Sequence, residues 1–168
     1  MKKQWQREWK LLTRHTSRIC FWIVFATCGG ILLWVHGCSA PLAYRAGVLP
    51  SFVPCFTLCF LLWLLTYALS GCEIGVLLLP ANFRLPTGRR EALACLLTYL
   101  LTLSWYPLFF SLLHIFLCTI LLSAAVLLHI WLFIHAVRRF SIVMIPQFFS
   151  CLLEMYFLCV TFAVLLVD

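Results

Sequence analysis

Residues 91–136 read EALACLLTYLLTLSWYPLFFSLLHIFLCTILLSAAVLLHIWLFIHA, a nearly continuous apolar run. A helix needs about 20 apolar residues to cross a bilayer, so about 45 of them are too many for a single crossing. The run therefore predicts two membrane helices that are separated near Ser111 and His114, the polar residues at the break. A single bent helix in their place, which would give the whole chain four helices, is the alternative.

Pro107 lies near the end of the first of these helices, with Trp105 and Tyr106 before it and Phe109 and Phe110 after it. Because proline lacks a backbone donor, we expect it to bend or end the helix. Trp and Tyr are enriched where a membrane meets water, since their rings are amphipathic. The residues of this stretch therefore predict an aromatic belt at a helix end.

The whole chain has the composition of a membrane protein. It is 65% hydrophobic and 10% charged, with a mean hydropathy of +1.08, whereas soluble domains are roughly 45–50% apolar and about 25% charged. Charged residues, Pro and Gly divide it into five candidate spans, at residues 19–37, 52–79, 91–110, 112–136 and 140–167. All should be helices, because a bilayer cannot satisfy open strand edges and no barrel-like alternation occurs.

The sequence thus predicts an all-α, polytopic integral membrane protein: a basic cytoplasmic tail at residues 1–18 and one five-helix transmembrane domain at residues 19–167. The first span is expected to be retained, because about 19 apolar residues exceed the usual 7–15 of a signal peptide.

Basic residues orient the predicted bundle. Five crossings place the tail and the loops that contain Arg84 and Arg138 on one side, and of the 12 Lys and Arg only Arg45 lies opposite. The positive-inside rule then predicts a cytoplasmic N-terminus and an external C-terminus. We attribute the net charge of +7 to topology and to contact with anionic lipid, and expect no nucleic-acid partner.

The chain has ten cysteines, a number that suggests a disulfide or metal framework. Their positions do not support one, because nearly all of them lie inside predicted spans. No CxxC occurs, and Cys55 and Cys59, which share a helical face, have no His or second Cys pair near them in sequence. We expect small apolar fillers between helices. His129 and His135 do not share a face, so we expect no haem ligand among them, no metal and no resident cofactor.

Two carboxyl groups lie inside predicted spans, where each costs about 2.5–3.5 kcal/mol at the membrane centre. Glu73 lies between Gly71 and Gly75, a spacing that allows close helix approach, and near enough to the span end to reach the interface. Glu154 lies deeper and has no obvious basic partner within the membrane. Two interpretations remain open for Glu154: a neutral carboxyl that lines a ligand cavity, and a proton relay.

Prolines and aromatic residues follow a particular order along the chain: Tyr44, Pro50, Pro54, Trp63 and Tyr67, with WYPLFF later. This order resembles the tryptophan-rich sensory protein family, also called translocator protein or peripheral-type benzodiazepine receptor. The family's first loop and second helix read roughly Y-x5-P-x-W-x-P-P-x-W-x-F-x3-W-x3-Y-x2-M-G. The resemblance covers residues 44–160, and about half of the diagnostic residues are substituted.

The resemblance implies a five-helix cavity for a flat apolar ligand, such as a tetrapyrrole (porphyrin) or a sterol, and a homodimer. Aromatic rings would stack on the ligand, and Ser150 or Glu154 would meet a polar edge. The implied ligand-binding residues are Tyr44, Phe52, Pro54, Trp63, Tyr67, Trp105, Phe109, Ser150 and Glu154. At two of these positions, Phe52 and Ser150, the family has Trp.

Three functions follow as hypotheses. The first is a membrane receptor or binding protein for such a ligand, with a role in sensing or transport. The second is a small proton-coupled transporter or assembly factor that uses Glu73 or Glu154. The third, implied only by the resemblance, is light-dependent porphyrin breakdown, which the family links to two cavity tryptophans of which Trp63 alone has a counterpart. No Walker, nucleophile-elbow, HExxH or paired-carboxylate motif occurs, so the residues themselves predict no enzyme.

Overall fold

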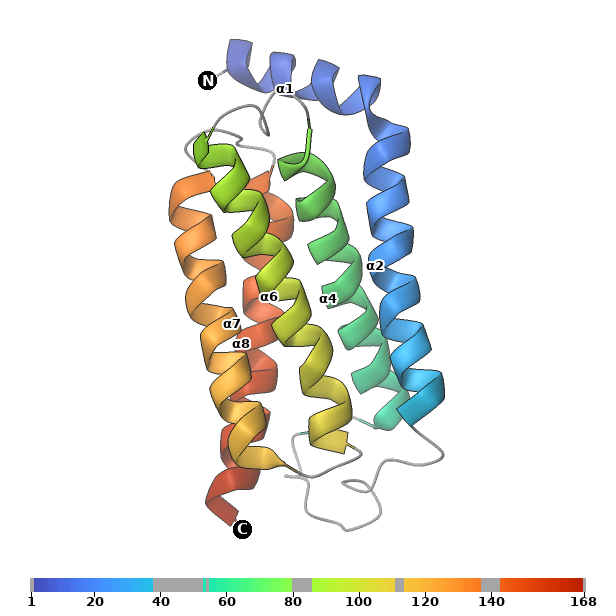
Figure 1. The fold of residues 1–168 in the computed structure, drawn as a ribbon, viewed down its shortest axis with the longest axis vertical. Coiled ribbons are helices and arrows are strands. Elements are labelled where there is room, and N and C mark those ends of the chain that lie inside the picture. Colours follow the sequence, from blue (N-terminus) through green and yellow to red (C-terminus); the bar gives the residue numbers. More distant parts are fainter. Residues whose placement is uncertain are drawn as a thin grey trace.

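The computed structural model describes residues 2–37, 53, 55–79, 86–110, 114–136 and 143–167. The described helices are α1 (Lys2–Arg14), α2 (Thr16–Gly37), α4 (Phe56–Leu77), α6 (Pro86–Phe110), α7 (Ile115–Ala136) and α8 (Met144–Val167) (Figure 1). All but α1 are long and apolar enough to cross a membrane. The all-α, five-span prediction is confirmed, and the chain is a multi-pass membrane protein.

The continuous apolar run is divided where the sequence indicates. Helix α6 ends at Phe110 and α7 begins at Ile115, so the alternative with one bent helix is wrong. Pro107 lies inside α6, which continues for three more residues. A proline this close to a helix end removes one backbone hydrogen bond without preventing the last turn. The amide of His114 donates to the carbonyl of Leu108 at 3.1 Å, which joins the two helices across the break.

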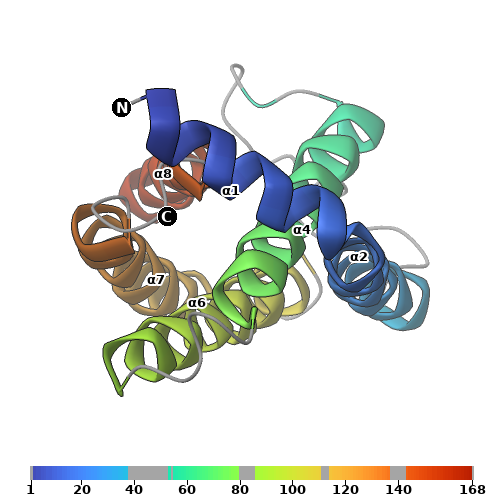
Figure 2. The ribbon, with the colours of Figure 1, turned by 90° about the horizontal axis from the view of Figure 1, so that it is seen from above.

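Four helices form a ring and a fifth lies outside it. Seen from above, α4, α6, α7 and α8 enclose a common interior, while α2 packs mainly on the outer side of α4 (Figure 2). Helix α1 lies across the end of the bundle where α2 begins, and the last residues of α8 lie at the other end. The ring places one face of each of four helices toward a shared core.

The seam between α2 and α4 depends on glycines. A Cβ on Gly71 would lie 2.6 Å from the carbonyl oxygen of Trp22 and 2.8 Å from Cα of Ile23, and one on Gly75 would lie 3.0 Å from Cα of Ile19. Only glycine allows such an approach of two helix backbones. The close approach predicted from the GxxxG spacing is confirmed, and its partner is α2 of the same chain.

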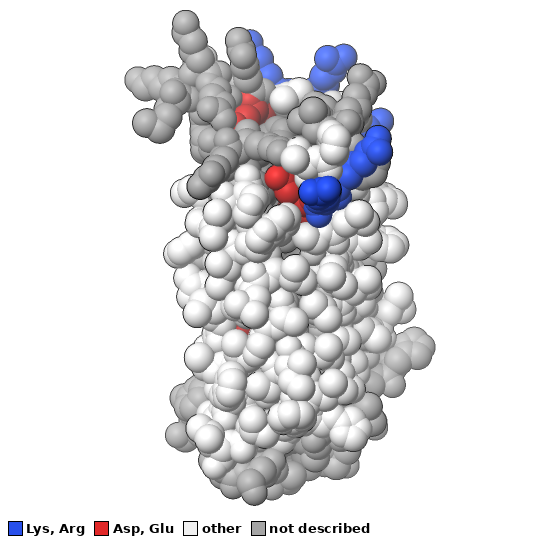
Figure 3. All heavy atoms as spheres, turned by 60° about the vertical axis from the view of Figure 1, so that its left-hand side comes forward, with Lys and Arg blue, Asp and Glu red and all other residues white. Residues whose placement is uncertain are grey.

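The basic side chains gather at one end of the bundle. Arg14, Arg18, Arg89 and Arg90 are exposed, and the described Lys and Arg lie at the N-terminal end, above a long body that shows no Lys or Arg in this view (Figure 3). Other positions on which the topology prediction rests lie outside the described residues: Arg45, Arg84, Arg138, Arg139 and Asp168.

We expect a cysteine-labelling or reporter-fusion map to place residues 84–90 and 138–139 on the same side of the membrane as the N-terminus, with residue 168 opposite. The reason is the odd number of spans together with the excess of Lys and Arg on one side. Labels introduced at residues 40–50 serve as the matched control for the opposite side. A map that places both termini on one side would contradict this topology.

Candidate functional site: a buried carboxyl, imidazole and carboxyl triad

The interior of the ring is partly polar. On α8, Gln147, Ser150, Glu154, Phe157 and Thr161 recur at intervals of three and four residues, which places them on one helical face. All five are fully buried. The other ring helices also direct polar side chains inward. These are Thr66, Ser70 and Glu73 on α4, Thr98 and Thr102 on α6, and His129 on α7.

Three ionisable side chains from three helices meet in this interior. Nδ1 of His129 lies 3.0 Å from Oε2 of Glu154, in a hydrogen bond. Nε2 of His129 lies 3.2 Å from Oε2 of Glu73, a close charge contact whose geometry is not that of an aligned hydrogen bond. Each of the three side chains is at most 1% exposed. The imidazole therefore bridges two carboxyl groups, and we refer to Glu73, His129 and Glu154 as the triad.

The triad carries its own charge balance. Every described Lys and Arg whose side chain is placed is exposed, so within the described residues no such cation neutralises the two carboxyl groups. With an imidazolium, one ionised and one protonated carboxyl, the triad holds two protons and is neutral. Loss of one proton leaves a net charge of −1, which a low-dielectric interior penalises strongly. Gain or loss of a proton by the triad therefore changes the free energy of the bundle strongly.

Thiols are the other titratable groups around the triad. Sγ of Cys95 on α6 lies 3.8 Å from Oε2 of Glu73. Cys72 on α4 and Cys151 on α8 interact electrostatically with Glu73 as well. The second carboxyl oxygens, Oε1 of both glutamates, are buried and have no hydrogen-bond partner in the described part of the chain. Each can accept a further donor.

A polar stripe leads from the triad toward the N-terminal end of the bundle. Ser150 and Gln147 lie one and two helical turns before Glu154, and α8 begins at Met144 at that end. The hydroxyl of Ser150 and both amide atoms of Gln147 are buried without hydrogen-bond partners among the described residues. Buried polar groups of this kind are usually satisfied by water. The stripe is a suitable lining for a hydrated route to Glu154.

An aromatic cluster fills the ring on the other side of the triad. The rings of Trp63 and Trp105 lie 4.5 Å apart, and Phe109 stacks on Trp105 at 4.8 Å. Phe157, one turn beyond Glu154, packs edge-on against Trp63 at 4.5 Å. Nε1 of Trp105 donates to the hydroxyl of Thr161 at 3.0 Å. The cluster separates the triad from the C-terminal end of the bundle.

The structure brings together part of the predicted ligand site. Trp63, Tyr67, Trp105 and Phe109 meet in the aromatic cluster, where Nε1 of Trp63 donates to the hydroxyl of Tyr67. Ser150 lies outside the cluster on the polar stripe. Whether these residues bind a ligand stays a prediction. Tyr44, Phe52 and Pro54 lie outside the described residues.

The belt interpretation of Trp105 and Tyr106 is wrong. Both residues face the bundle core, with 0% and 3% of their surface exposed. Trp105 has a hydrogen-bond partner inside the ring, so an interfacial position is not needed to satisfy its indole N–H.

The expectation that Glu154 has no basic partner within the membrane is wrong, because His129 of α7 lies beside it. The sequence contains a signal for this pair. Helices α7 and α8 are consecutive and antiparallel. Residues at similar distances from the connection between two such helices lie at similar depth, and His129 and Glu154 satisfy this condition.

The cysteines that the structure describes form no metal site with their described neighbours. All cysteines in the described residues are free thiols, and that part of the chain holds no group of three or more His, Cys, Asp or Glu arranged for a metal ion. Cys59, Cys95 and Cys118 are buried, while Cys55 is exposed. The pair Cys55 and Cys59 therefore does not form a shared buried site.

Comparison of the chain with protein-family models, with curated proteins and with solved structures finds no match. The resemblance to the translocator protein family rests on the residues quoted from the sequence. What is established is an apolar five-span bundle with a tryptophan-containing aromatic cluster.

Proposed function

We propose that the protein is a proton-coupled membrane carrier in which the triad takes up and releases the coupled proton. The observation that supports this is the meeting of Glu73, His129 and Glu154 at 3.0 and 3.2 Å inside the membrane-spanning bundle. Ionisable residues within membrane helices are costly and typically serve proton relays or ion pathways. Imidazole suits the task because it can gain or lose a proton near neutral pH.

A purely structural role gives a weaker reason for the triad. Replacing a buried ion pair by packed apolar residues is often neutral or stabilising by about 1–4 kcal/mol. The ring already has a large apolar and aromatic core for its stability. The energetic cost of the triad is therefore better explained by a function that uses its protons.

The surroundings of the triad support exchange with one side of the membrane in this conformation. The polar stripe of Gln147 and Ser150 leads to the N-terminal end, whereas the aromatic cluster fills the other direction. The threonine hydroxyls on that far side bond to carbonyls of their own helices, as Thr102 does to Tyr99 at 2.9 Å. They offer no free donors for a continuous proton path.

Infrared titration of the purified full chain tests the proposal. We expect the band of a protonated buried carboxyl to disappear reversibly as the pH is raised from about 5 to 9, because the triad then releases a proton. Glu154→Gln should remove or shift this band, since the amide cannot ionise.

His135→Gln is the matched control, because His135 lies on the same helix, is exposed, and contacts the carbonyl of Trp131 rather than a carboxyl group. It should titrate as the wild type does. A carboxyl band that does not change over this range in the wild type would overturn the proposal, since the triad would then be a fixed network.

A further inference from the structure

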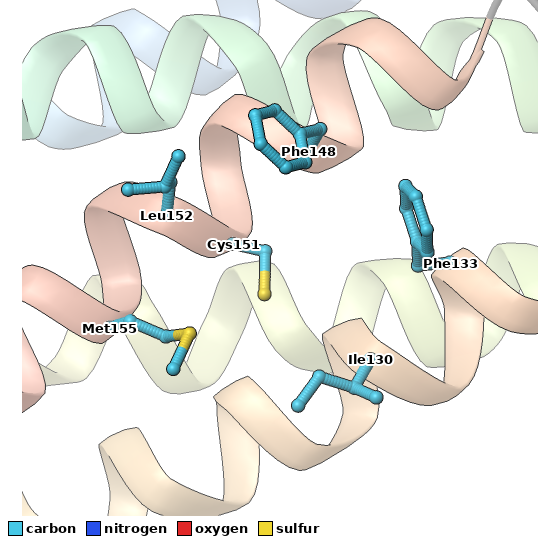
Figure 4. A pocket seen from close by; sticks show the side chains of 6 residues that line it. All are labelled: Ile130, Phe133, Phe148, Cys151, Leu152 and Met155. Carbon is cyan, nitrogen blue, oxygen red and sulfur yellow. The ribbon is translucent and has the colours of Figure 1, made fainter.

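A second feature of α8 lies beside the triad. An apolar groove of about 210 Å³ runs between α7 and α8. Its lining residues are Ile130, Phe133, Phe148, Cys151, Leu152 and Met155 (Figure 4). Phe148, Leu152 and Met155 are about half exposed on the outer surface of the bundle. The groove therefore opens toward the bilayer rather than toward water.

The groove lies at the depth of the triad. Ile130 directly follows His129, and Cys151 and Met155 flank Glu154 on α8. Figure 4 shows the sulfur of Cys151 pointing from α8 toward α7, at the centre of the groove. The thiol of Cys151 interacts electrostatically with His129 and Glu154. Cys151 thus lines the apolar groove and also interacts with the ionisable groups of the triad.

We propose that this groove and the triad together bind a lipophilic amine in its ammonium form, which enters from the bilayer in exchange for one proton. The inference rests on the proposed proton-carrier function and names its substrate class. The apolar part of the amine lies between α7 and α8, and the ammonium group replaces the released proton beside Glu154. The unpartnered Oε1 atoms of Glu154 and Glu73 accept its hydrogen bonds.

Charge complementarity selects this occupant over a plain lipid chain. In its neutral form the triad would hold two protons, and releasing one of them to water would leave a net charge of −1. An ammonium ion then restores neutrality, so one proton leaves for each amine that binds and the buried charge is unchanged. A neutral acyl chain fills the groove without affecting the triad, and an anion would add to its negative charge.

The volume of the groove limits the size of the apolar part of the substrate that it can enclose. A cavity of about 150 Å³ lined by Leu, Ile and Phe is enough to bind benzene, so 210 Å³ suits one aromatic ring with a short chain. Phe133 and Phe148 offer ring faces and edges for such a group. Larger apolar parts can extend through the open side into the lipid.

The test uses the full chain in detergent, in weakly buffered solution with a pH-indicator dye. The probe is 4-phenylbutylamine hydrochloride adjusted to the pH of the protein, and the control compound is 4-phenylbutanol, which has the same apolar part and no charge. We expect close to one proton released for each amine bound, and none with the alcohol. Because the amine competes with one proton, its apparent Kd should rise about tenfold for each unit by which the pH falls.

Variants locate the site. Glu154→Gln should abolish proton release, and Phe148→Ala should weaken amine binding about tenfold through loss of a groove wall. Leu166→Ala removes an exposed apolar side chain of the same helix far from the groove, 84% exposed, and should bind the amine as the wild type does. Retention of wild-type affinity by Phe148→Ala would overturn the groove as the site.

The outcomes separate this inference from the function on which it rests. If the wild-type carboxyl band titrates but amine and alcohol bind alike without proton release, the groove is a lipid site and this inference is wrong while the proton-carrier function stands. If the band does not titrate, the proton-carrier function is itself wrong.

Discussion

His129→Ala is expected to destabilise the bundle by about 3–5 kcal/mol at neutral pH, because it removes the one cation-forming partner that bridges Glu73 and Glu154 in the described interior. The two carboxyl groups would then face each other without neutralisation. To remain buried, both must hold protons that the unfolded chain has released at that pH. The folded variant therefore binds more protons than the unfolded one, so its stability should fall as the pH rises and recover in acid.

Thermal or denaturant unfolding in detergent at pH 5 and pH 8 measures this effect. His135→Ala provides the control, since that exposed side chain contacts the carbonyl and the ring of its helix neighbour Trp131 rather than a carboxyl group. Its free energy of unfolding should differ from that of the wild type by no more than about 0.5 kcal/mol. Replacing Glu73, His129 and Glu154 together by Leu should restore stability while eliminating proton exchange. If His129→Ala and the wild type have the same free energy of unfolding at pH 8, the imidazole does not neutralise the carboxyl groups.

Trp63→Ala is expected to cost about 3–5 kcal/mol of stability, the range of a large aromatic side chain removed from a core. Trp63 is 2% exposed and contacts the rings of Trp105 and Phe157 at 4.5 Å. Its removal also leaves the hydroxyl of Tyr67 without its indole donor. Unfolding in detergent measures the loss, and Trp9→Ala, at an exposed tryptophan of α1, should have little effect.

A second substitution at the same position, Trp63→Phe, examines the planar-ligand prediction. If Trp63 stacks on a porphyrin, Trp63→Phe, which keeps most of the packing, should weaken protoporphyrin binding by about 1–3 kcal/mol. Quenching of the remaining tryptophans follows the titration. Unchanged affinity in Trp63→Phe would assign the ring to the core alone.

Hydropathy was enough to predict the five spans, because the cost of placing charged residues in lipid limits where each helix can begin and end. The predicted 91–110 and observed Pro86–Phe110 differ only at the start, where Arg89 and Arg90 extend the helix beyond its apolar part. Helix α1 was not predicted, since a search for apolar spans does not detect a short basic helix.

The site was harder to predict than the fold. Glu73 and Glu154 were identified because each is anomalous within its own span. The triad is a property of three helices, and which faces of those helices meet is decided by packing that hydropathy does not encode. Likewise, Trp105 reads as interfacial by its position near a helix end, but it faces inward because Thr161 and the rings around it provide better partners.

The glycines of α2 have a mechanical consequence. The ring of Tyr67 lies where a Cβ of Gly30 would be, and the hydroxyl of Tyr99, which donates to the carbonyl of Ala26, lies 2.6 Å from the Cβ position of Gly29. A slide of α2 by one turn would bring larger side chains against both tyrosines, so the glycines fix the height of the first membrane helix on the bundle. Because the hydroxyl of Tyr67 also accepts a hydrogen bond from Trp63, the position of the outermost helix and the packing of the central aromatic cluster depend on the same tyrosine.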